Sequence, residues 1–324
     1  MSHHKDSRGQ FGKVAVLYGG TSTEREISLI TGQAVWEALV RCDVDAHLVD
    51  TKQGFLTRMQ TDNFKTAWIA LHGSDGEDGK IQSFLESMNI RFTGSGSLSC
   101  SLTMNKLFTK KILSNNGFKT PDFLQVTNSD DYEKIVKKIK LPFVLKPCSQ
   151  GSSIGVHIIE NRRNYEKKLK TLNDFNDWII AESYITGPEY TAGFLDGETL
   201  PLVKIDAGQN EFYDYEAKYY SQETKYVCPS GLDIKLEDKV KNKCTDIFKL
   251  FDIKGWARTD FFINEDYEPI FLEINTVPGM TLHSLVPMAA SAVGINFDQL
   301  CFRILETSIP VSYTHLTLPT ILLV

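Results

Sequence analysis

The segment that most restricts the fold of this chain is residues 256–279, WARTDFFINEDYEPIFLEINTVPG. Two runs rich in β-branched and aromatic residues flank a polar turn at residues 264–268, which predicts a β-hairpin. Arg258 and Asp260 are two residues apart on one run, and Glu273 and Asn275 on the other. Because side chains alternate between faces along a strand, each pair shares a face. A paired hairpin would therefore gather a guanidinium, two carboxylates and an amide.

Oxygen ligands of this kind suit Mg²⁺, which binds one or two carboxylates together with phosphate oxygens rather than an all-protein cage. The alternative is a surface hairpin with ordinary salt bridges, since charged residues mostly lie at protein surfaces. The pairing of the two runs, and the Pro278-Gly279 that follows them, favours a metal–nucleotide site.

Composition narrows the class of protein. The chain has 324 residues, of which 42% are hydrophobic and 23% charged, as in globular proteins with a substantial core. A net charge of −6 without a dense basic stripe argues against a nucleic-acid partner. The six cysteines are scattered without C-x-x-C spacing, which argues against a zinc site. With no apolar signal core and no run of membrane-spanning length, we expect a cytoplasmic protein without a membrane partner.

The order of apolar runs predicts three lobes. In residues 13–101, strands at 14–17 and 68–71 alternate with helices, which indicates a parallel sheet. The first helix is expected to begin with a capping box formed by Thr23 and Glu26. Residues 102–185 form an α+β lobe that starts with one helix at 102–116, and residues 186–310 form a strand-rich lobe. Residues 311–324 are apolar and threonine-rich, and we interpret them as a non-native tail rather than a native strand.

Phosphate binding is expected at Lys146 and the loop that follows it, residues 150–155 (QGSSIG). Glycines let backbone N–H groups approach phosphate oxygens, and serine hydroxyls add donors; a flexible turn is the alternative. Lys106 could add a second charge or lie in solvent. Glu182 and Glu189 flank an apolar segment that could hold an adenine ring or be a plain linker.

Two further features concern a substrate. Glu24 lies at the expected start of the first helix, where it could bind a substrate ammonium or only stabilise the helix dipole. Residues 210–229 are polar and aromatic without a clear period, which predicts a long ordered loop. That loop contains Lys218 and Tyr219, and it could close over a ligand or pack against the surface.

These motifs together resemble ATP-grasp enzymes, and within them the D-alanine–D-alanine ligase family, over residues 13–306. The motifs that carry the resemblance are GGTSTEREISL at 19–29, ALHGSDGEDG at 70–79, TGSG at 93–96, KPCSQGSSIGV at 146–156, FYDYEAKY at 212–219, and the hairpin segment through LEINTVPGMTLHSLVP. The resemblance implies an α/β fold of three lobes in the ATP-grasp architecture, with a parallel-sheet N-terminal lobe and ATP between the second and third lobes.

The resemblance also implies roles for individual residues. Those implied to bind the nucleotide are Lys106, Lys146, Ser153, Glu182, Ile185, Glu189 and Lys218. Those implied to hold two Mg²⁺ ions, or Mn²⁺ in their place, are Asp260, Glu273 and Asn275, with Glu273 bridging the ions. Glu24 is implied to hold the ammonium of the first D-alanine, and Ser152 and Tyr219 to tie the closing loop to Glu24. The groups implied to surround the reacting carboxylate and the two substrates are His72, Arg258, Gly279, Ser284 and Leu285.

The activity implied is ATP-dependent ligation of two D-alanines through an acyl phosphate, for peptidoglycan precursor synthesis, by a homodimer. Tyr219 resembles the dipeptide-forming subtype of the family, whereas Val277 stands where small polar residues are common. Two alternatives remain: another ATP-grasp carboxylate–amine ligase, and a nucleotide-binding regulator that has lost turnover.

Overall fold

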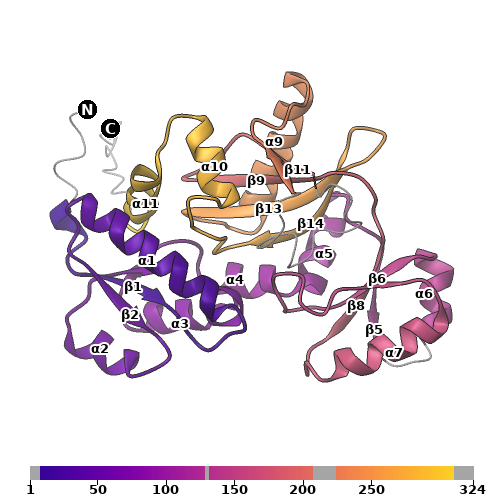
Figure 1. Cartoon of the computed structure of the whole chain (residues 1–324), viewed down its shortest axis with the longest axis horizontal. Coiled ribbons are helices and arrows are strands. Elements are labelled where there is room, and N and C mark those ends of the chain that lie inside the picture. Colours follow the sequence, from indigo (N-terminus) through magenta and orange to yellow (C-terminus); the bar gives the residue numbers. More distant parts are fainter. Residues whose placement is uncertain (1–7, 128–130, 207–223, 310–324) are drawn as a thin grey trace, which may run out of the picture.

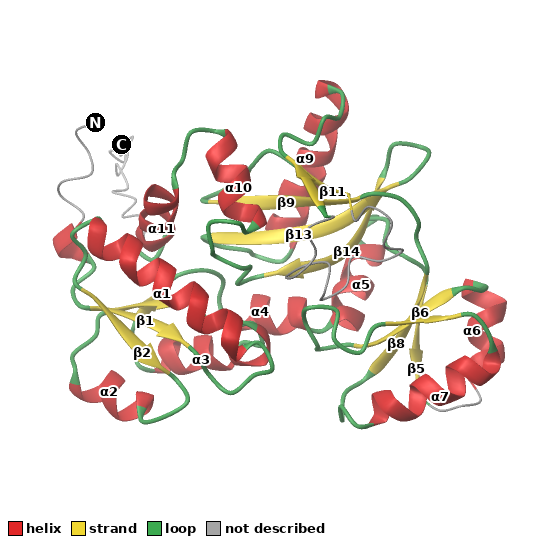
Figure 2. Cartoon of the chain, viewed as in Figure 1, coloured by secondary structure: helices red, strands yellow, loops and turns green. Residues whose placement is uncertain are grey.

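The computed structural model of the chain describes residues 8–127, 131–206 and 224–309. Their helices and strands form three lobes, which confirms the three-lobed α/β architecture expected from the sequence (Figures 1 and 2). The tail at residues 311–324 and most of the predicted loop lie outside the described residues.

The N-terminal lobe is a four-stranded parallel sheet covered by helices, as the alternating pattern predicted. Its strands lie in the order β2-β1-β3-β4. The strands are β1 (Val14–Tyr18), β2 (Ala46–Asp50), β3 (Thr66–Ile69) and β4 (Arg91–Phe92). The helices are η1 (Arg8–Gln10), α1 (Arg25–Arg41), α2 (Phe55–Thr61), η2 (Gly73–Asp75) and α3 (Lys80–Ser87).

The single helix predicted at residues 102–116 is wrong, because the chain forms two helices there. Helix α4 (Ser97–Met104) ends and α5 (Lys106–Asn115) begins at Asn105, whose ψ of 101° leaves the helical region. The Asn105 side chain accepts hydrogen bonds from the N–H groups of Leu107 and Phe108, and therefore caps α5. The break makes Lys106 the first residue of α5. Leu113 of α5 packs in the same apolar core as Phe271 of the C-terminal lobe.

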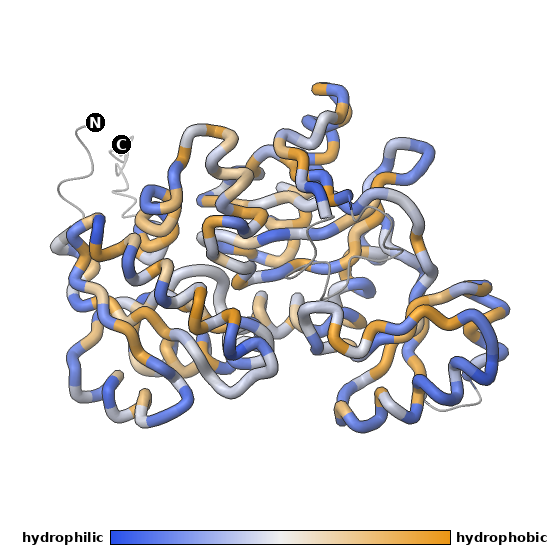
Figure 3. Tube along the Cα trace, in the orientation of Figure 1, coloured by the Kyte–Doolittle hydropathy of each residue, from blue (hydrophilic) through white to orange (hydrophobic). Residues whose placement is uncertain are grey.

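The central lobe is an antiparallel sheet of order β5-β8-β6-β7 with two helices against it. Figure 3 shows apolar residues along its strands and hydrophilic residues along its outer helices. Its core includes the aromatic cluster of Tyr132, Phe143 and Tyr165. The elements are β5 (Phe123–Val126), α6 (Tyr132–Ile139), β6 (Phe143–Pro147), β7 (His157–Ile159), α7 (Arg162–Asn173) and β8 (Ile179–Ser183).

The C-terminal lobe contains a larger antiparallel sheet, in which β12-β11-β9-β13-β14 are neighbours and β10 pairs with β9. Its strands are β9 (Glu189–Leu195), β10 (Glu198–Thr199), β11 (Val203–Asp206), β12 (Lys225–Val227), β13 (Trp256–Ile263) and β14 (Pro269–Asn275). Its helices are α9 (Ile234–Leu250), α10 (Leu285–Ala292) and α11 (Phe297–Glu306).

The N-terminal and C-terminal lobes share one apolar core. Residues of α10 and α11 pack with those of β1 and β3, and the rings of Trp68 and Trp256 lie 5.4 Å apart between the two lobes. Within the described ranges no single helix is long and apolar enough to span a membrane; α10 and α11 meet that test only as a pair bent by 102°.

Candidate active site

The hairpin predicted at residues 256–279 is confirmed. Strands β13 and β14 pair antiparallel, with Arg258 opposite Asn275 and Asp260 opposite Glu273. The turn is closed by the Asn264 side chain, which accepts a hydrogen bond of 2.9 Å from the N–H of Glu268. The register shifts after Asp260, and such bulges often occur next to active sites, where they redirect side chains. The four polar side chains therefore meet at one end of the hairpin, as the spacing predicted.

Asp260 is buried and strongly bonded. Arg258 donates to both of its oxygens, from Nε at 2.8 Å and from a terminal nitrogen at 2.7 Å, which is the bidentate geometry typical of strong charge-assisted pairs. The Thr191 hydroxyl donates at 2.7 Å and the Asn275 amide at 3.1 Å. This network fixes the Asp260 carboxylate. Because the amide nitrogen of Asn275 donates to Asp260, the carbonyl oxygen of that amide is the Asn275 atom that could bind a metal.

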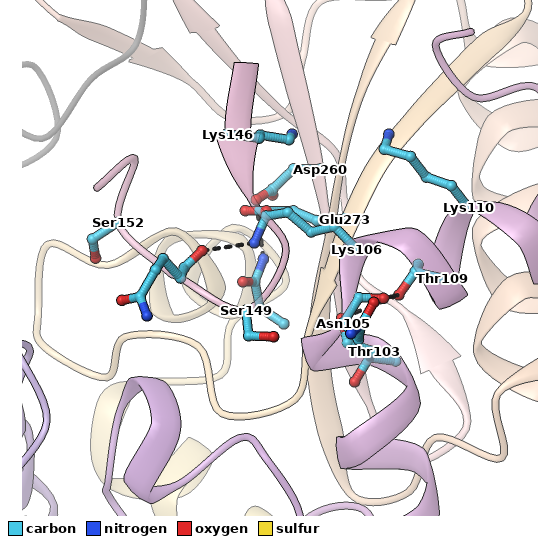
Figure 4. Close-up of polar contacts among 12 residues, drawn as sticks. Thr103, Asn105, Lys106, Thr109, Lys110, Lys146, Ser149, Ser152, Asp260 and Glu273 are labelled. Carbon is cyan, nitrogen blue, oxygen red and sulfur yellow. Dashed lines mark hydrogen bonds and ion pairs between the residues drawn. The ribbon is translucent and has the colours of Figure 1, made fainter. Parts of the chain in front are cut away.

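Lys106 connects the hairpin to the predicted phosphate loop. Its Nζ lies 3.4 Å from Glu273 Oε2 and donates a hydrogen bond of 2.7 Å to the carbonyl oxygen of Gln150. Figure 4 shows the Lys106 side chain beside Glu273 and Asp260. The backbone N–H of Lys106 also donates to the carbonyl oxygen of Cys148 at 3.0 Å. Lys106 is therefore buried, and the alternative prediction that its side chain lies in solvent is wrong.

The hairpin offers two carboxylates and one amide oxygen to a metal. In the described part of the chain no group of three or more His, Cys, Asp or Glu side chains could hold an ion. Two carboxylates with an amide fit Mg²⁺, which takes its remaining ligands from water and phosphate. The Lys106 ammonium lies 3.4 Å from Glu273, which indicates that the Glu273 carboxylate attracts positive charge.

A second ionic cluster lies behind the phosphate loop. Glu182 is 2% exposed, and its oxygens lie between two ammonium groups, with Lys146 Nζ 3.0 Å from Oε1 and Lys110 Nζ 3.3 Å from Oε2. Burial acts to raise the pKa of Glu182, but the two lysines outweigh it and the pKa is lowered. Burial lowers the pKa of Lys110 to about 8. For Lys146 burial is outweighed by Glu182 and Glu273, so its pKa is raised.

Lys110 was not among the residues expected from the sequence. Its spacing of four residues from Lys106 could have indicated it, because residues four apart share a helix face. Its burial could not be inferred from the sequence, since its neighbour Lys111 on α5 is exposed.

Glu24 contacts the phosphate loop through Ser152, whose hydroxyl donates to Glu24 Oε1 at 2.5 Å. Ser152 and Ser153 adopt positive φ values of 49° and 60°, which indicates local backbone strain. A Cβ on Gly151 would lie 2.7 Å from Glu24 Oε2, and one on Gly73 2.5 Å from the same atom. The carboxylate therefore fits between two glycines that approach it closely.

The capping box predicted for Thr23 and Glu26 is wrong. Helix α1 begins at Arg25, with Glu24 as its N-cap and no side-chain cap hydrogen bond. The segment before it is held instead by Asp75, which accepts hydrogen bonds from the backbone N–H groups of Thr21 and Ser22. A carboxylate distant in sequence therefore holds the chain just before the helix, while the first turn of α1 has no side-chain cap.

His72 connects the N-terminal lobe to the segment after the hairpin. Its Nδ1 lies 2.9 Å from the carbonyl oxygen of Val277, and its Nε2 lies 2.9 Å from the hydroxyl of Thr31. A carbonyl can only accept, so Nδ1 carries the proton and Nε2 accepts from Thr31. Burial lowers the pKa of His72, which favours this neutral form. Both ring nitrogens are thus bonded to the protein.

Glu77 is a second residue that the sequence analysis did not select. It accepts a hydrogen bond of 3.0 Å from the N–H of Gly73, the glycine that also approaches Glu24. Burial and the nearby charge of Glu24 raise the pKa of Glu77 to about 8. The acidic stretch of residues 75–78 in the motif at 70–79 could have indicated a carboxylate here, but not which one faces the site.

Most of the predicted site residues line two adjoining cavities. The first has a volume of about 480 Å³ and contains the residues predicted for the amino-acid substrates: Glu24, His72, Ser152, Arg258, Gly279, Ser284 and Leu285, with Glu77, Glu273 and Asn275. The second contains those predicted for the nucleotide: Lys106, Lys146, Ser153, Glu182, Ile185 and Glu189. Asp260 lines neither of these two cavities; it is buried and bonded to Arg258, which lines the first. Lys218 and Tyr219 lie outside the described residues.

Known proteins resemble this chain over nearly its whole length. The family models described as "D-ala D-ala ligase N-terminus" and "D-ala D-ala ligase C-terminus" match residues 49–95 and 112–306. The chain is 43% identical to a D-alanine–D-alanine ligase of Nitrosomonas europaea over 297 residues, which cover 92% of this chain and 97% of that protein. It is 42% identical to a D-alanine–D-alanine ligase of Nitrosococcus oceani over 299 residues, which cover 92% of this chain and 94% of that protein.

A solved structure supports the same relationship. The crystal structure of a D-alanine–D-alanine ligase from Bacillus anthracis complexed with ATP aligns with a TM-score of 0.80 and 32% identity, over 91% of this chain and 96% of that one. From these relatives, and from the arrangement of the two cavities, the chain belongs to the D-alanine–D-alanine ligase family.

Proposed function

We propose that this protein joins two D-alanine molecules into D-alanyl-D-alanine, with conversion of ATP to ADP and phosphate. The observation that carries the proposal is the junction of the two cavities, which share Lys106, Gly151, Ser152 and Glu273 in their walls. A carboxylate in the first cavity can therefore meet the end of a triphosphate that enters from the second. We further propose that the protein acts as a homodimer and supplies peptidoglycan precursors.

The second cavity supports adenine binding. Glu182 Oε1 is buried, and among the residues that the structure describes its partner is the Lys146 ammonium at 3.0 Å. A carboxylate oxygen can accept more than one hydrogen bond, and the exocyclic amine of adenine can supply a further donor. Ile185 and Glu189 line the same cavity; we assign Ile185 to the apolar face of the ring and Glu189 to the ribose hydroxyls.

The hairpin supplies the ligands for magnesium. We assign Asp260, Glu273 and the Asn275 carbonyl oxygen to two Mg²⁺ ions, with Mn²⁺ as a substitute. When bound, the ions offset the negative charge of the phosphates during transfer. Lys106 and Lys146 line the same cavity, and we assign them to add positive charge at the phosphates, with Ser153 of the loop as a hydrogen-bond donor. Lys218, outside the described residues, is proposed as a further nucleotide contact.

The first cavity supports binding of the two amino acids. Glu24 offers a carboxylate to the ammonium of the first D-alanine, and the Ser152 hydroxyl fixes its orientation. Ser284 is the N-cap of α10 and Leu285 its first residue. Because the N-terminus of a helix attracts anions, this end of α10 suits the carboxylate of the second D-alanine. Tyr219 is proposed to join the Glu24–Ser152 pair from the loop outside the described residues.

The proposed reaction has two steps. A carboxylate oxygen of the first D-alanine attacks the γ-phosphorus, and ADP leaves to give an acyl phosphate. The amine of the second D-alanine, after losing a proton from its ammonium form, attacks the acyl carbon, and inorganic phosphate leaves. Arg258 and Gly279 both line the cavity, and we assign the Arg258 guanidinium and the Gly279 N–H to stabilise the oxyanion that forms between the two steps.

Product analysis tests this function. With D-alanine and MgATP we expect D-alanyl-D-alanine and phosphate in equal amounts; phosphate without the dipeptide would instead indicate another carboxylate–amine ligase. Glu273→Gln should abolish metal-dependent turnover. Glu268→Gln is the matched control, because Glu268 lies on the same hairpin but pairs with Lys239 and Lys243 at the surface. Equal activity of both variants would contradict the metal assignment.

A further inference from the structure

Lys110 is a fully buried lysine that the proposed reaction does not use. Its side chain has 0% exposure, and its Nζ lies 3.3 Å from Glu182 Oε2 and 3.1 Å from the hydroxyl of Thr120. It lies one helical turn beyond Lys106 on α5, and Figure 4 shows its ammonium on the same side of that helix as Lys146. Burial of a lysine ammonium costs free energy unless the charge is paired. The burial of Lys110 therefore requires an explanation.

The two oxygens of Glu182 have different surroundings. Oε2 pairs with Lys110, which is absent from the wall of the nucleotide cavity. Oε1 lies near Lys146, which lines that cavity together with Glu182. One ammonium is therefore fixed behind the carboxylate, whereas the other is exposed to whatever enters the cavity.

This difference matters when a nucleotide binds. Phosphate oxygens entering the cavity compete with Glu182 for the Lys146 ammonium, because both are anionic. If Lys146 were the only counter-charge, its movement toward phosphate would leave a buried carboxylate without a partner, which is strongly unfavourable. Lys110 removes this conflict, since its contacts to Glu182 and Thr120 do not depend on the nucleotide.

We propose that Lys110 is a positioning residue for purine recognition, which holds Glu182 by Oε2 so that Oε1 can accept the 6-amino group of adenine while Lys146 contacts phosphate. The inference rests on the proposed nucleotide site. It predicts that Lys110 affects the choice of base, although it touches no part of the nucleotide. A lysine that only stabilised the fold would affect all nucleotides equally.

The test compares ATP with purine riboside triphosphate, which lacks the 6-amino group. Binding of each to the full chain is measured by calorimetry with Mg²⁺, for wild type and for Lys110→Met, which keeps an unbranched apolar side chain and removes the ammonium group. We expect ATP affinity to fall roughly tenfold, the size of one lost charge-assisted hydrogen bond, with little change for the analogue. An equal loss for both nucleotides, or no loss for either, would overturn the role of Lys110.

Three further variants make the result decisive. Lys111→Met is the matched control, because Lys111 is the exposed neighbour on the same helix, and it should behave as wild type. Thr120→Val keeps Lys110 but removes its hydrogen bond to the Thr120 hydroxyl. We expect it to lower ATP affinity in the same direction by a smaller factor. This variant keeps the test valid if Lys110→Met does not fold. Glu182→Met tests the site itself, because methionine has no oxygen that can accept from the 6-amino group. If this variant leaves the preference for ATP unchanged, the adenine assignment fails. A lost preference in Glu182→Met with a normal Lys110→Met refutes only the role of Lys110.

Discussion

Glu77 provides a test of the electrostatics of the amino-acid cavity. Its pKa is raised from 4.5 to about 8, first by burial and then by the charge of Glu24. The folded protein therefore holds a proton on Glu77 at pH values where the unfolded chain has released it. The stability due to this proton is fully present below about pH 4.5 and is lost as the pH rises through about 8.

The magnitude follows from the shift. Each pKa unit corresponds to about 1.36 kcal/mol, so the change from 4.5 to about 8 gives an upper limit of about 5 kcal/mol. The Glu77 side chain is only partly buried by surface area, and water screens the interaction. A realistic effect on the free energy of unfolding is therefore about 1–2 kcal/mol.

The assay is denaturant unfolding of wild type and Glu77→Gln at pH 5 and pH 9. Glutamine imitates the neutral carboxyl, so the two proteins should have similar stability at pH 5. At pH 9 the variant should be more stable than wild type by about 1–2 kcal/mol. Glu265→Gln, at an exposed position in the hairpin turn, should show no such dependence. A difference between wild type and Glu77→Gln that stays constant with pH would refute the reasoning.

Two other substitutions probe the contacts around the same cavity. Gly151→Ala would place a Cβ 2.7 Å from Glu24 Oε2, so we expect a higher KM for D-alanine in steady-state assays. Gly9→Ala is the control, because a Cβ there meets nothing within 4 Å, and its KM should equal that of wild type. Equal KM values for the two variants would contradict the close fit at Gly151. His72→Phe removes both ring hydrogen bonds and leaves the carbonyl oxygen of Val277 without this partner. We expect the free energy of unfolding, measured with denaturant, to fall by about 2–4 kcal/mol. An unchanged unfolding midpoint would show that these bonds contribute little.

The hairpin could be predicted from the sequence because its signals are local. Period-two alternation predicted which side chains within each run share a face, and the polar turn at residues 264–268 predicted that the two runs pair. The turn alone would place Asp260 opposite Leu272. The register shift after Asp260 brings Glu273 opposite it instead, and this bulge could not be predicted from the pattern. The order of strands and helices in the first lobe was similarly sufficient to predict its parallel sheet.

The features that could not be predicted depend on contacts between distant segments. The break at Asn105 interrupts an otherwise good helical pattern, and the resulting α5 starts where Lys106 bonds to Cys148 and Gln150. The cap expected from Thr23 does not form, and Asp75, some fifty residues away in the chain, binds the segment before the helix. Single-sequence patterns carry no information about such partners, because tertiary contacts override local preferences.

The way the lobes are joined favours movement of the central lobe during the reaction. The N-terminal and C-terminal lobes share an extensive apolar core through α10, α11 and Trp256, and separating them would expose it to water. The central lobe has its own core and meets α5 through a small cluster around Leu107.

Its described contact with Glu24 is the polar bond from Ser152, which water can replace at little cost. The proposed nucleotide site lies along this weaker junction, and most of the proposed amino-acid site lies against the rigid one. Opening of the central lobe would therefore admit ATP and break the Ser152–Glu24 bond, while His72, Arg258 and the start of α10 stay in place in the other two lobes.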